Sequence, residues 1–350
     1  MKFDYCIGNP PYQEQAPGES TSEKPLYHFF MDAACDISSC VELITPARFL
    51  FNAGATPKEW NKKMLSSPHF QVLDYDADAT NYFPNTAITG GIAVTMFDKR
   101  INIIPVGQFI PNKELNSICR KVVNDNGFSS MSDIVSGRTP YSFTNVLHSE
   151  HPEAKSSLSK GHMYDISSNA FPSLPDIFIV KRPDEVSNYY RVLGRLNNER
   201  AYCWILRKYA CGRVDEFIGM WKVFLPKANG ASGMLGDEPA RLISKPVVGE
   251  PYDIATDTFL CVGSFNTQAE AQALLKYMSS KFARVLLGTL KVTQINAKET
   301  WRNVPLQDFT SKSDIDWSQS VSEIDRQLYR KYGLSEDEIQ FIETHVKEMN

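Results

Sequence analysis

The sequence predicts an α/β protein in which part of an open sheet is followed by an α+β region and by C-terminal helices. Apolar strands alternate with amphipathic helices through the first hundred residues, which is the pattern of an open α/β sheet. From about residue 126 to 310 the apolar runs are short, and Ser, Asn and Pro are common. Residues 321–348 have the periodicity of helices.

The elements of the first hundred residues are bounded by Gly, Pro and polar segments. The first strand, FDYCI (3–7), ends at a glycine and two prolines. A polar loop is expected over 13–24, and Pro25 suits the start of a helix. A strand over 41–51 is expected to break at Pro46. The other expected elements are helices at 25–37 and 57–67 and strands at 70–76 and 88–98, the last two forming a hairpin.

Helices are also expected in the rest of the chain. Residues 100–125 lead into a helix. Residues 267–288 have a strong apolar face and an N-cap candidate in Thr267, which predicts one long helix. The tail is expected to form two helices, with Gly333 ending the first and a capping box of Ser335 and Glu338 starting the second.

The composition is that of a soluble globular protein, with 42% hydrophobic and 22% charged residues. No apolar run reaches the roughly 18–20 residues that a membrane span needs, and no secretion signal stands at the start. The seven cysteines contain no CxxC pair, which favours reduced cytoplasmic thiols over disulfides or a metal site. A net charge of −4 counts mildly against autonomous nucleic-acid binding, although a local basic face can coexist with it.

Asn9, Pro10, Pro11 and Tyr12 stand at the carboxyl end of the first strand, where ligands bind in open α/β sheets. The two prolines make a rigid loop and leave the carbonyl of Pro10 free, because proline fixes φ and donates no N–H. With the Asn9 carboxamide, this gives two acceptors for the two protons of an exocyclic NH2 group. Tyr12 offers a flat face for stacking. The segment therefore predicts a site for a flipped-out base whose amino group is the nucleophile, and the plainer interpretation is a turn after a strand.

DYCIGNPPYQ (4–13) resembles motif IV of the N6-adenine DNA methyltransferases, and the order of the segments fits their gamma class. The whole chain resembles the C-terminal portion of the type IIG-like restriction-modification methylases. LYHFFMDAA (26–34), LITPARFLF (43–51) and NYFPNTAITGGIAVTMF (81–97) are similar to motifs V, VI and VIII. The resemblance implies the second half of a partial Rossmann-like methyltransferase sheet. It also implies that Tyr12 and Phe83 enclose the flipped adenine; a plain core phenylalanine is the alternative for Phe83.

Methyltransferases of this type take the methyl group from S-adenosylmethionine, which they bind in the first half of the sheet. That half carries a glycine loop and an acidic strand end, and no convincing equivalent stands in AGAT (53–56), ITGGIA (88–93) or ANGASGMLG (228–236). The binding motif is therefore expected to be absent from this chain. A protein partner with the cofactor half, or a truncated and inactive reading frame, would explain this; a nuclease motif is not found either.

The resemblance implies three domains: a partial catalytic domain at 1–105, a target-recognition domain at 106–310, and a helical segment at 311–350. A reader of double-stranded DNA needs cations for phosphates and amides or guanidinium groups for base edges. Each candidate can also be an ordinary surface residue. The candidates are Lys222, Lys227, Asn229, Lys245, Lys291, Gln294, Asn296 and Arg302.

The sequence thus predicts a component of a DNA adenine-N6 methyltransferase that transfers methyl directly, without a covalent enzyme intermediate. The main alternative is a DNA-recognition module that keeps the fold and never binds cofactor. A more distant one is methylation of another amide or amine, because Asn-Pro-Pro-Tyr reports a planar NH2 group and not DNA as such.

Overall fold

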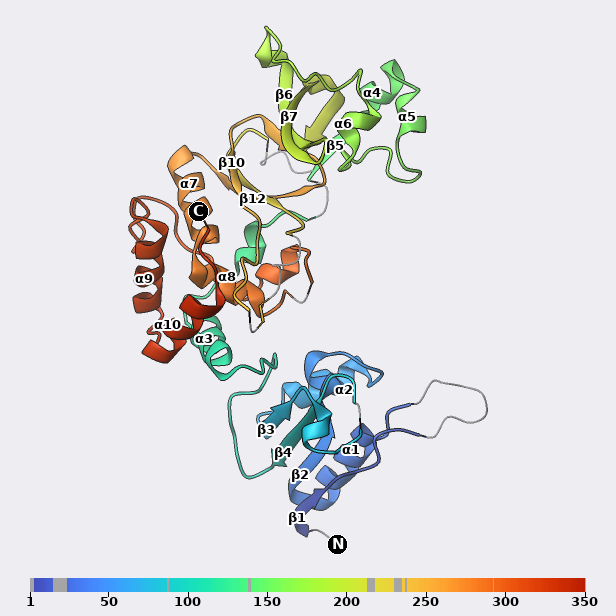
Figure 1. Ribbon diagram of the computed structural model, residues 1–350, viewed down its shortest axis with the longest axis vertical. Coiled ribbons are helices and arrows are strands. Elements are labelled where there is room, and N and C mark those ends of the chain that lie inside the picture. The colour runs from blue at the N-terminus through green and yellow to red at the C-terminus, as the bar shows by residue number, and fades with distance from the viewer. Residues whose placement is uncertain are drawn as a thin grey trace. The chain divides into compact units, whose positions relative to one another are not determined.

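The computed structural model describes residues 3–14, 24–86, 88–137, 140–212, 218–229, 235–236, 238–291 and 293–349. The chain forms two compact units, Met1–Asn112 and Lys113–Asn350 (Figure 1). Most of the loop expected at 13–24 and of the glycine segment at 228–236 lies outside the described residues. The first unit ends at Asn112, where the sequence suggested a boundary after residue 105, and residues 311–350 belong to the second unit.

The first unit is built around a four-stranded sheet with the order β1-β2-β4-β3. Strand β1 runs parallel to β2, and β4 lies antiparallel between β2 and β3. Strand β1 is thus an edge strand. The elements of this unit are β1 (Phe3–Gly8), α1 (Tyr27–Ile37), β2 (Ser38–Pro46), the 3-10 helix η1 (Ala47–Phe51), α2 (Lys58–Leu65), β3 (Phe70–Asp76), η2 (Ala79–Asn81) and β4 (Ile92–Asp98).

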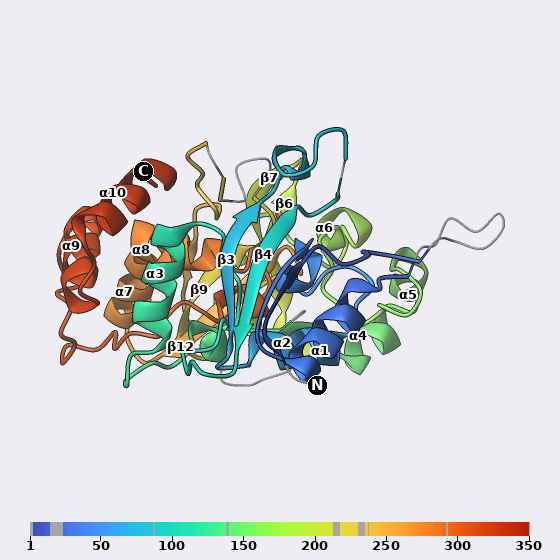
Figure 2. The ribbon, with the colours of Figure 1, turned by 90° about the horizontal axis from the view of Figure 1, so that it is seen from below.

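Helices α1 and α2 contribute to one hydrophobic core with the sheet (Figure 2). Met31 of α1, Val41 of β2 and Trp60 of α2 are buried together there. The indole Nε1 of Trp60 donates to the Asp32 carboxylate of α1 at 3.0 Å, which joins the two helices. The face of α1 that packs on the sheet is formed by Tyr27, His28, Met31 and Ala34. The apolar spacing in the sequence points to Phe29, Phe30 and Ile37 instead, and this needs correction, because these side chains are 60%, 43% and 45% exposed.

The break expected at Pro46 is confirmed, because β2 ends there. Residues 47–51 form the 3-10 helix η1, which ends at Asn52 with a left-handed φ of 53°. The start expected for the last strand of this unit needs correction. The last strand begins at Ile92 instead of residue 88, because Gly90 and Gly91 have φ of 90° and 80° and form a turn. A Cβ on Gly91 would lie 2.2 Å from the backbone oxygen of Asp76, so the turn requires glycine.

The second unit combines small sheets with a group of helices. Within its described residues the sheets have the orders β10-β9-β12, β11-β6-β7 and β5-β8. Helices α3 and α7–α10 gather at one end, and β6, β7 and α4–α6 lie at the other (Figure 1). The helices of four or more residues are α3 (Lys113–Val123), η3 (Met131–Ile134), α4 (Asn145–Glu150), α5 (Ala154–Ser157), α6 (Ala170–Ser173), α7 (Gln268–Ser279), α8 (Lys281–Gly288), η8 (Lys298–Trp301), α9 (Val321–Lys331) and α10 (Glu336–His345). The strands are β5 (Tyr141–Phe143), β6 (Tyr189–Leu196), β7 (Glu199–Leu206), β8 (Ala210–Gly212), β9 (Trp221–Pro226), β10 (Val247–Gly249), β11 (Asp253–Ala255) and β12 (Phe259–Phe265).

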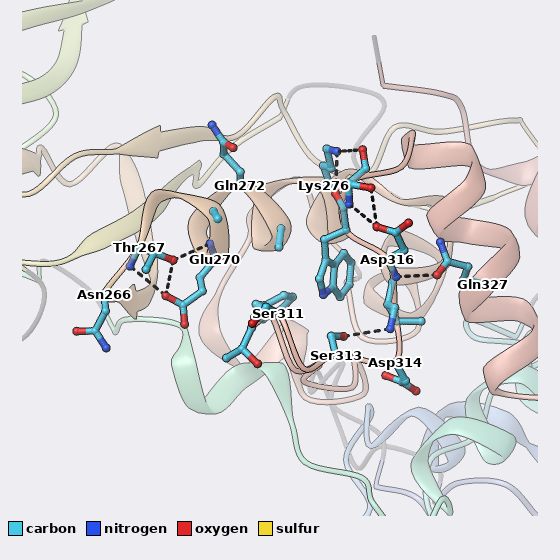
Figure 3. A pocket seen from close by; sticks show the side chains of 17 residues that line it. Asn266, Thr267, Glu270, Gln272, Lys276, Ser311, Ser313, Asp314, Asp316 and Gln327 are labelled. Atoms are coloured by element: carbon cyan, nitrogen blue, oxygen red, sulfur yellow. Dashed lines mark hydrogen bonds between the residues drawn. The ribbon is translucent and has the colours of Figure 1, made fainter.

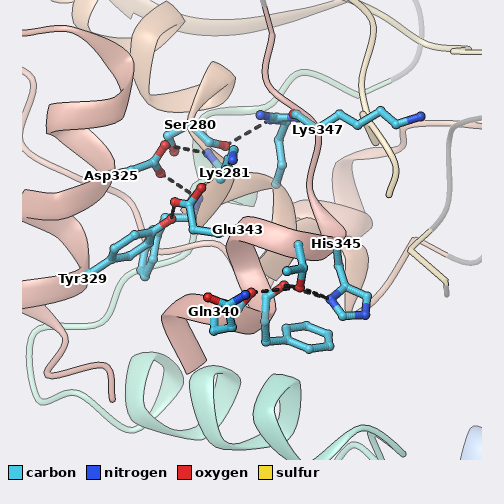
Figure 4. Close-up of polar contacts among 12 residues, drawn as sticks. Ser280, Lys281, Asp325, Tyr329, Gln340, Glu343, His345 and Lys347 are labelled. Carbon is cyan, nitrogen blue, oxygen red and sulfur yellow. Dashed lines mark hydrogen bonds and ion pairs between the residues drawn. The ribbon is translucent and has the colours of Figure 1, made fainter. Parts of the chain in front are cut away.

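The single helix expected over 267–288 is wrong, because the structure divides it into α7 and α8 at Ser280. Ser280 has an extended backbone, and its hydroxyl accepts from the Ala283 N–H as the N-cap of α8. The Asp325 carboxylate of α9 accepts from the backbone N–H groups of Lys281 and Phe282 at 3.0 and 2.9 Å (Figure 4). The break is stabilised because these caps satisfy the first N–H groups of α8.

The remaining helix boundaries agree with the sequence. Thr267 caps α7 in a capping box with Glu270, and Ser335 caps α10 in one with Glu338. Gly333 has a left-handed φ of 59° after α9. Among the described residues, no helix combines the length and the apolar character that crossing a membrane requires.

Candidate active site

The segment Asn9–Tyr12 follows β1 at the edge of the sheet where β2 also ends. The parallel register pairs Gly8 of β1 with Leu43 of β2, so the two carboxyl ends point the same way. The backbone oxygen of Tyr12 accepts from the Leu26 N–H at 2.9 Å, which ties the segment to the start of α1. Asn9 is exposed, and its carboxamide makes no hydrogen bond with another described residue. The segment is thus fixed at one end and presents a solvent-facing acceptor at the other.

A cavity of about 560 Å³ opens beside this segment. Its volume is that of a typical small-molecule site. It is formed at the carboxyl ends of β1 and β2, together with the turn before β4. The residues that line it are Pro11, Tyr12, Gln13, Pro25, Tyr27, Pro46, Arg48, Gly54, Ala55, Thr86, Ile88 and Thr89.

The phenol of Tyr12 is an unusual group in this cavity. Its hydroxyl is buried and has no hydrogen-bond partner among the described residues. Burial raises the pKa of Tyr12 to about 12, so the phenol is neutral at physiological pH. Buried hydroxyls in proteins nearly always have a partner, and an unmatched one calls for a functional explanation.

Phe83 lies next to Tyr12, with its ring centroid 6.5 Å from that of Tyr12 and the ring planes inclined by 69°. Its backbone N–H bonds to the Ala79 oxygen at 2.9 Å, which continues the turn of η2. A flat ring stacked between two others needs parallel planes about 7 Å apart, because each stacking distance is about 3.5 Å. The structure therefore brings the two aromatics to the right separation with an edge-to-face orientation.

Tyr27 and Arg48 also line the cavity, and neither was singled out from the sequence. Tyr27 is the first residue of α1 and is buried. Burial raises its pKa to about 12, while the nearby Thr56 hydroxyl and the charge of Arg48 act in the opposite direction. Arg48 is the second residue of η1, two positions after the end of β2. The signal that could have found both is positional, since residues after neighbouring parallel strands meet at one edge of the sheet.

Some of the candidate DNA-binding residues of the second unit are exposed, and others are buried. The chain segments 227–229 and 294–296 lie side by side, because the Asn229 N–H bonds to the Gln294 oxygen and the Asn296 N–H bonds to the Lys227 oxygen. Gln294, Lys245 and Arg302 are exposed and can reach a ligand in solution. Lys227 forms an ion pair with Asp257.

Two of these candidates, Lys222 and Lys291, are buried lysines, with exposed fractions of 0% and 2%. The ammonium of Lys222 donates to the Ile218 oxygen at 3.0 Å. That of Lys291 donates to the Asn229 carboxamide at 2.6 Å and to the Leu242 oxygen at 2.7 Å. Burial lowers the pKa of each lysine to about 8. Lys222 thus stabilises the turn that leads into β9, and Lys291 joins two loops. We do not retain either lysine as a phosphate contact.

Asn296 is also buried, and its amide nitrogen donates to the Pro226 oxygen at 3.0 Å. It therefore supports the end of β9 from within. The amide oxygen of Asn229 is already used by Lys291, which leaves its nitrogen without a partner among the described residues.

A cavity of about 1150 Å³ lies in the second unit, between α7 and the loop 309–318 (Figure 3). Lys276 donates to the backbone oxygens of Trp317, Ser318 and Gln319 at 2.8, 3.1 and 2.8 Å. The Asp316 carboxylate accepts hydrogen bonds from the side chains of Ser318 and Gln319. The Glu270 carboxylate caps α7. These charged groups serve the local fold, so this cavity is not a candidate active site.

The comparisons with known proteins include a family match over the first part of the chain. Residues 1–83 match the family model described as Eco57I restriction-modification methylase. This confirms the resemblance of that part of the chain to the restriction-modification methylases. The same stretch contains Asn9, Tyr12, Arg48 and Phe83.

One curated relative is an uncharacterized adenine-specific methylase of Mycoplasma pneumoniae (strain ATCC 29342 / M129 / Subtype 1). It is 28% identical over 95 residues, which cover 26% of this chain and 22% of the relative. The chain therefore matches about a fifth of that protein's length.

Two solved structures give weaker likenesses. The type IIG restriction endonuclease BpuSI has a TM-score of 0.30 at 11% identity, covering 87% of this chain and 44% of that chain. The type IIL restriction-modification enzyme MmeI in complex with DNA has a TM-score of 0.32 at 11% identity, covering 98% and 57%. Both TM-scores are too low to support a conclusion about the fold.

Proposed function

We propose that this chain is a component of a site-specific DNA adenine-N6 methyltransferase of a restriction-modification system. The observation that carries the proposal is the Asn-Pro-Pro-Tyr segment at the end of β1, beside a cavity lined by Tyr12. The match of residues 1–83 to the restriction-modification methylases supports it, as does a relative described as adenine-specific. DNA would be the substrate, and the cytoplasm would be its place of action.

In this proposal Asn9 and Pro10 hold the amino group of an adenine flipped out of the duplex. The Asn9 carboxamide oxygen and the Pro10 carbonyl each accept one N–H of the amino group. Holding both protons moves the nitrogen from planar toward pyramidal and makes its lone pair available. Tyr12 and Phe83 would stack on the base after one ring turns by the inclination now seen between them. The rigid loop of Pro10 and Pro11 keeps the acceptors in place while the base enters.

S-adenosylmethionine would supply the methyl group in this reaction. Among the described residues, no strand of the four-stranded sheet is followed by a glycine loop that opens a helix. Strand β1 leads into Asn-Pro-Pro-Tyr, and β2 leads into η1. We therefore assign this chain the binding of the base and leave the binding of the methyl donor to another polypeptide segment.

The edge strand β1 is the place where that segment would join. The sheet order, with an antiparallel β4 inserted between β2 and β3, suits the second half of a Rossmann-like methyltransferase sheet. Strand β1 pairs only with β2 among the described residues, and its Phe3, Tyr5 and Ile7 side chains are 49%, 60% and 75% exposed. An open edge with apolar side chains is a template for strand addition. We propose that a protein partner with the cofactor half pairs there.

A DNA-recognition module without catalysis is the second candidate, favoured by the lack of a donor site among the described residues. Two measurements separate the candidates. The first is calorimetry of S-adenosylmethionine with the isolated chain, for which we expect no binding. The second is transfer of labelled methyl to DNA by the chain coexpressed with a cofactor-half polypeptide from the same genome.

Asn9→Ala tests the site itself in that coexpressed enzyme. We expect loss of methylation with DNA binding retained, because one of two acceptors for the amino group is removed and the exposed side chain supports no other residue. Wild-type complexes that bind DNA and donor without methylating would support the recognition module instead. Retained methylation by the variant would overturn the role of Asn9.

A further inference from the structure

Arg48 is held at the cavity by two glycines whose backbone only glycine adopts readily. Gly54 and Gly90 have φ of 86° and 90°. A Cβ on Gly90 would lie 2.6 Å from Cγ of Arg48, and one on Gly54 would lie 3.3 Å from its Cβ and 3.4 Å from its Nε. The stem of the arginine therefore runs between two glycine backbones. These are the glycines of AGAT (53–56) and ITGGIA (88–93), for which the base-binding proposal has no other use.

Among the described residues, the guanidinium of Arg48 has no counter-charge. The side chain is exposed and makes no ion pair or hydrogen bond with another described residue. None of the residues that line the cavity with it carries a carboxylate. Its charge is felt by Tyr27 across the cavity, where it lowers the pKa of the phenol against the larger effect of burial. A cation that lines a cavity and has no partner in the described part of the chain is suited to an anionic ligand group.

We propose that Arg48 binds a phosphate of the nucleotide whose base occupies the cavity beside Tyr12. This rests on the proposed function, because the cavity is taken to hold adenine. A guanidinium offers planar, paired N–H donors that match phosphate oxygens, and it keeps its charge at any physiological pH. Phosphate contacts fix the register of a nucleic acid without reading its sequence. Arg48 is thus a positioning residue that anchors the sugar-phosphate backbone of the flipped nucleotide.

The test compares two small probes that differ only in their phosphates, 2′-deoxyadenosine and 2′-deoxyadenosine 3′,5′-bisphosphate. Binding of each to the full chain is measured by ligand-observed NMR titration at low salt. We expect the wild type to bind the bisphosphate about tenfold more tightly than the nucleoside, as one charge-assisted contact provides. Arg48→Gln should remove that preference and leave nucleoside binding unchanged, and Arg48→Lys should keep part of it.

Two further variants make the test specific. Lys58→Gln removes an exposed cation of α2 that does not line the cavity, and it should leave the preference unchanged. Gly90→Ala keeps the charge of Arg48 and displaces its stem, so it should weaken bisphosphate binding alone. Circular dichroism of each variant confirms that the fold is intact.

Three results would overturn the proposal. A bisphosphate preference that persists in Arg48→Gln would show that another group binds the phosphate. An equal loss of affinity for both probes in that variant would show that Arg48 contacts the base and not a phosphate. If the wild type does not bind the nucleoside, the cavity is not an adenine site. That result would overturn both the proposed function and the role of Arg48.

Discussion

The ring of Phe83 meets the ring of Tyr12 edge to face, at a centroid separation of 6.5 Å. The two side chains come from segments 71 residues apart in the sequence, the end of β1 and the turn after η2. The separation suits a flat base between them, and the inclination of 69° does not. In the proposed enzyme, one ring turns when the base enters.

The Tyr12 side chain should contribute its ring and not its hydroxyl. Tyr12→Phe should retain base binding, and its free energy of unfolding should be unchanged or higher by up to about 1 kcal/mol, because a buried hydroxyl without a described partner is removed. Tyr12→Ala should weaken binding of 2-aminopurine deoxynucleoside by about tenfold, since one stacked ring is worth about 1–3 kcal/mol. Fluorescence quenching of 2-aminopurine measures this directly. Equal losses in both variants would instead assign the hydroxyl a role in binding.

The salt dependence of DNA binding should distinguish the exposed cations of the second unit, which can contact phosphates, from the buried ones, which cannot. Arg302→Gln is expected to reduce the slope of log K against log salt by about one for a mixed-sequence DNA duplex, as loss of one phosphate contact does. Lys291→Met should leave that slope unchanged. It should lower the free energy of unfolding by about 1–3 kcal/mol, because the Asn229 and Leu242 oxygens lose their donor. Fluorescence anisotropy over a salt series provides the slopes, and a changed slope in Lys291→Met would return that lysine to the DNA-binding set.

The pH dependence of stability should carry a contribution from Asp325. Burial raises the pKa of this carboxyl to about 6, although the N–H groups of Phe282 and Lys281 oppose the shift. The folded state then binds more protons than the unfolded state between about pH 4 and 6, so stability falls as pH rises through that window. Relative to Asp325→Asn, the wild type should lose about 2 kcal/mol from pH 4 to pH 7. Denaturant unfolding followed by tryptophan fluorescence at several pH values measures the difference; a constant difference would contradict the prediction.

The sequence predicted the elements of the first unit because their signals are local. Pro46 ends β2 at the expected break, and the helical periodicity of residues 25–37 depends only on neighbouring residues. The 3-10 helix after Pro46 was not predicted, because an apolar run does not distinguish a strand from a buried 3-10 helix. The break between α7 and α8 was missed because its support, Asp325, is 45 residues beyond Ser280 in the chain.

The candidate site was predicted only where a motif is contiguous. Asn9–Tyr12 is one segment, and its chemistry can be inferred from residue types alone. Arg48 was missed because its position beside Tyr12 depends on the parallel register of β1 and β2 and on glycines at 54 and 90. Lys222 and Lys291 were taken as surface cations because lysines are rarely buried, and nothing in the local sequence marks the exceptions.

The open edge of β1 gives the last prediction, which concerns the protein partner. Ile7→Lys places a charge on the most exposed of the three apolar side chains of β1, at 75% exposure. The isolated chain should fold as before, because little buried surface is lost, while assembly with a cofactor-half polypeptide should be abolished, because an edge lysine opposes strand addition. Leu73→Lys is the matched control, since Leu73 lies on β3 at the other end of the sheet order and is 46% exposed. Copurification of the coexpressed polypeptides, with methyl transfer as a second readout, should show loss for Ile7→Lys alone. If both variants assemble equally well, the partner binds a different surface. If both lose assembly, the added charge itself causes the loss, and the β1 edge is not the specific site.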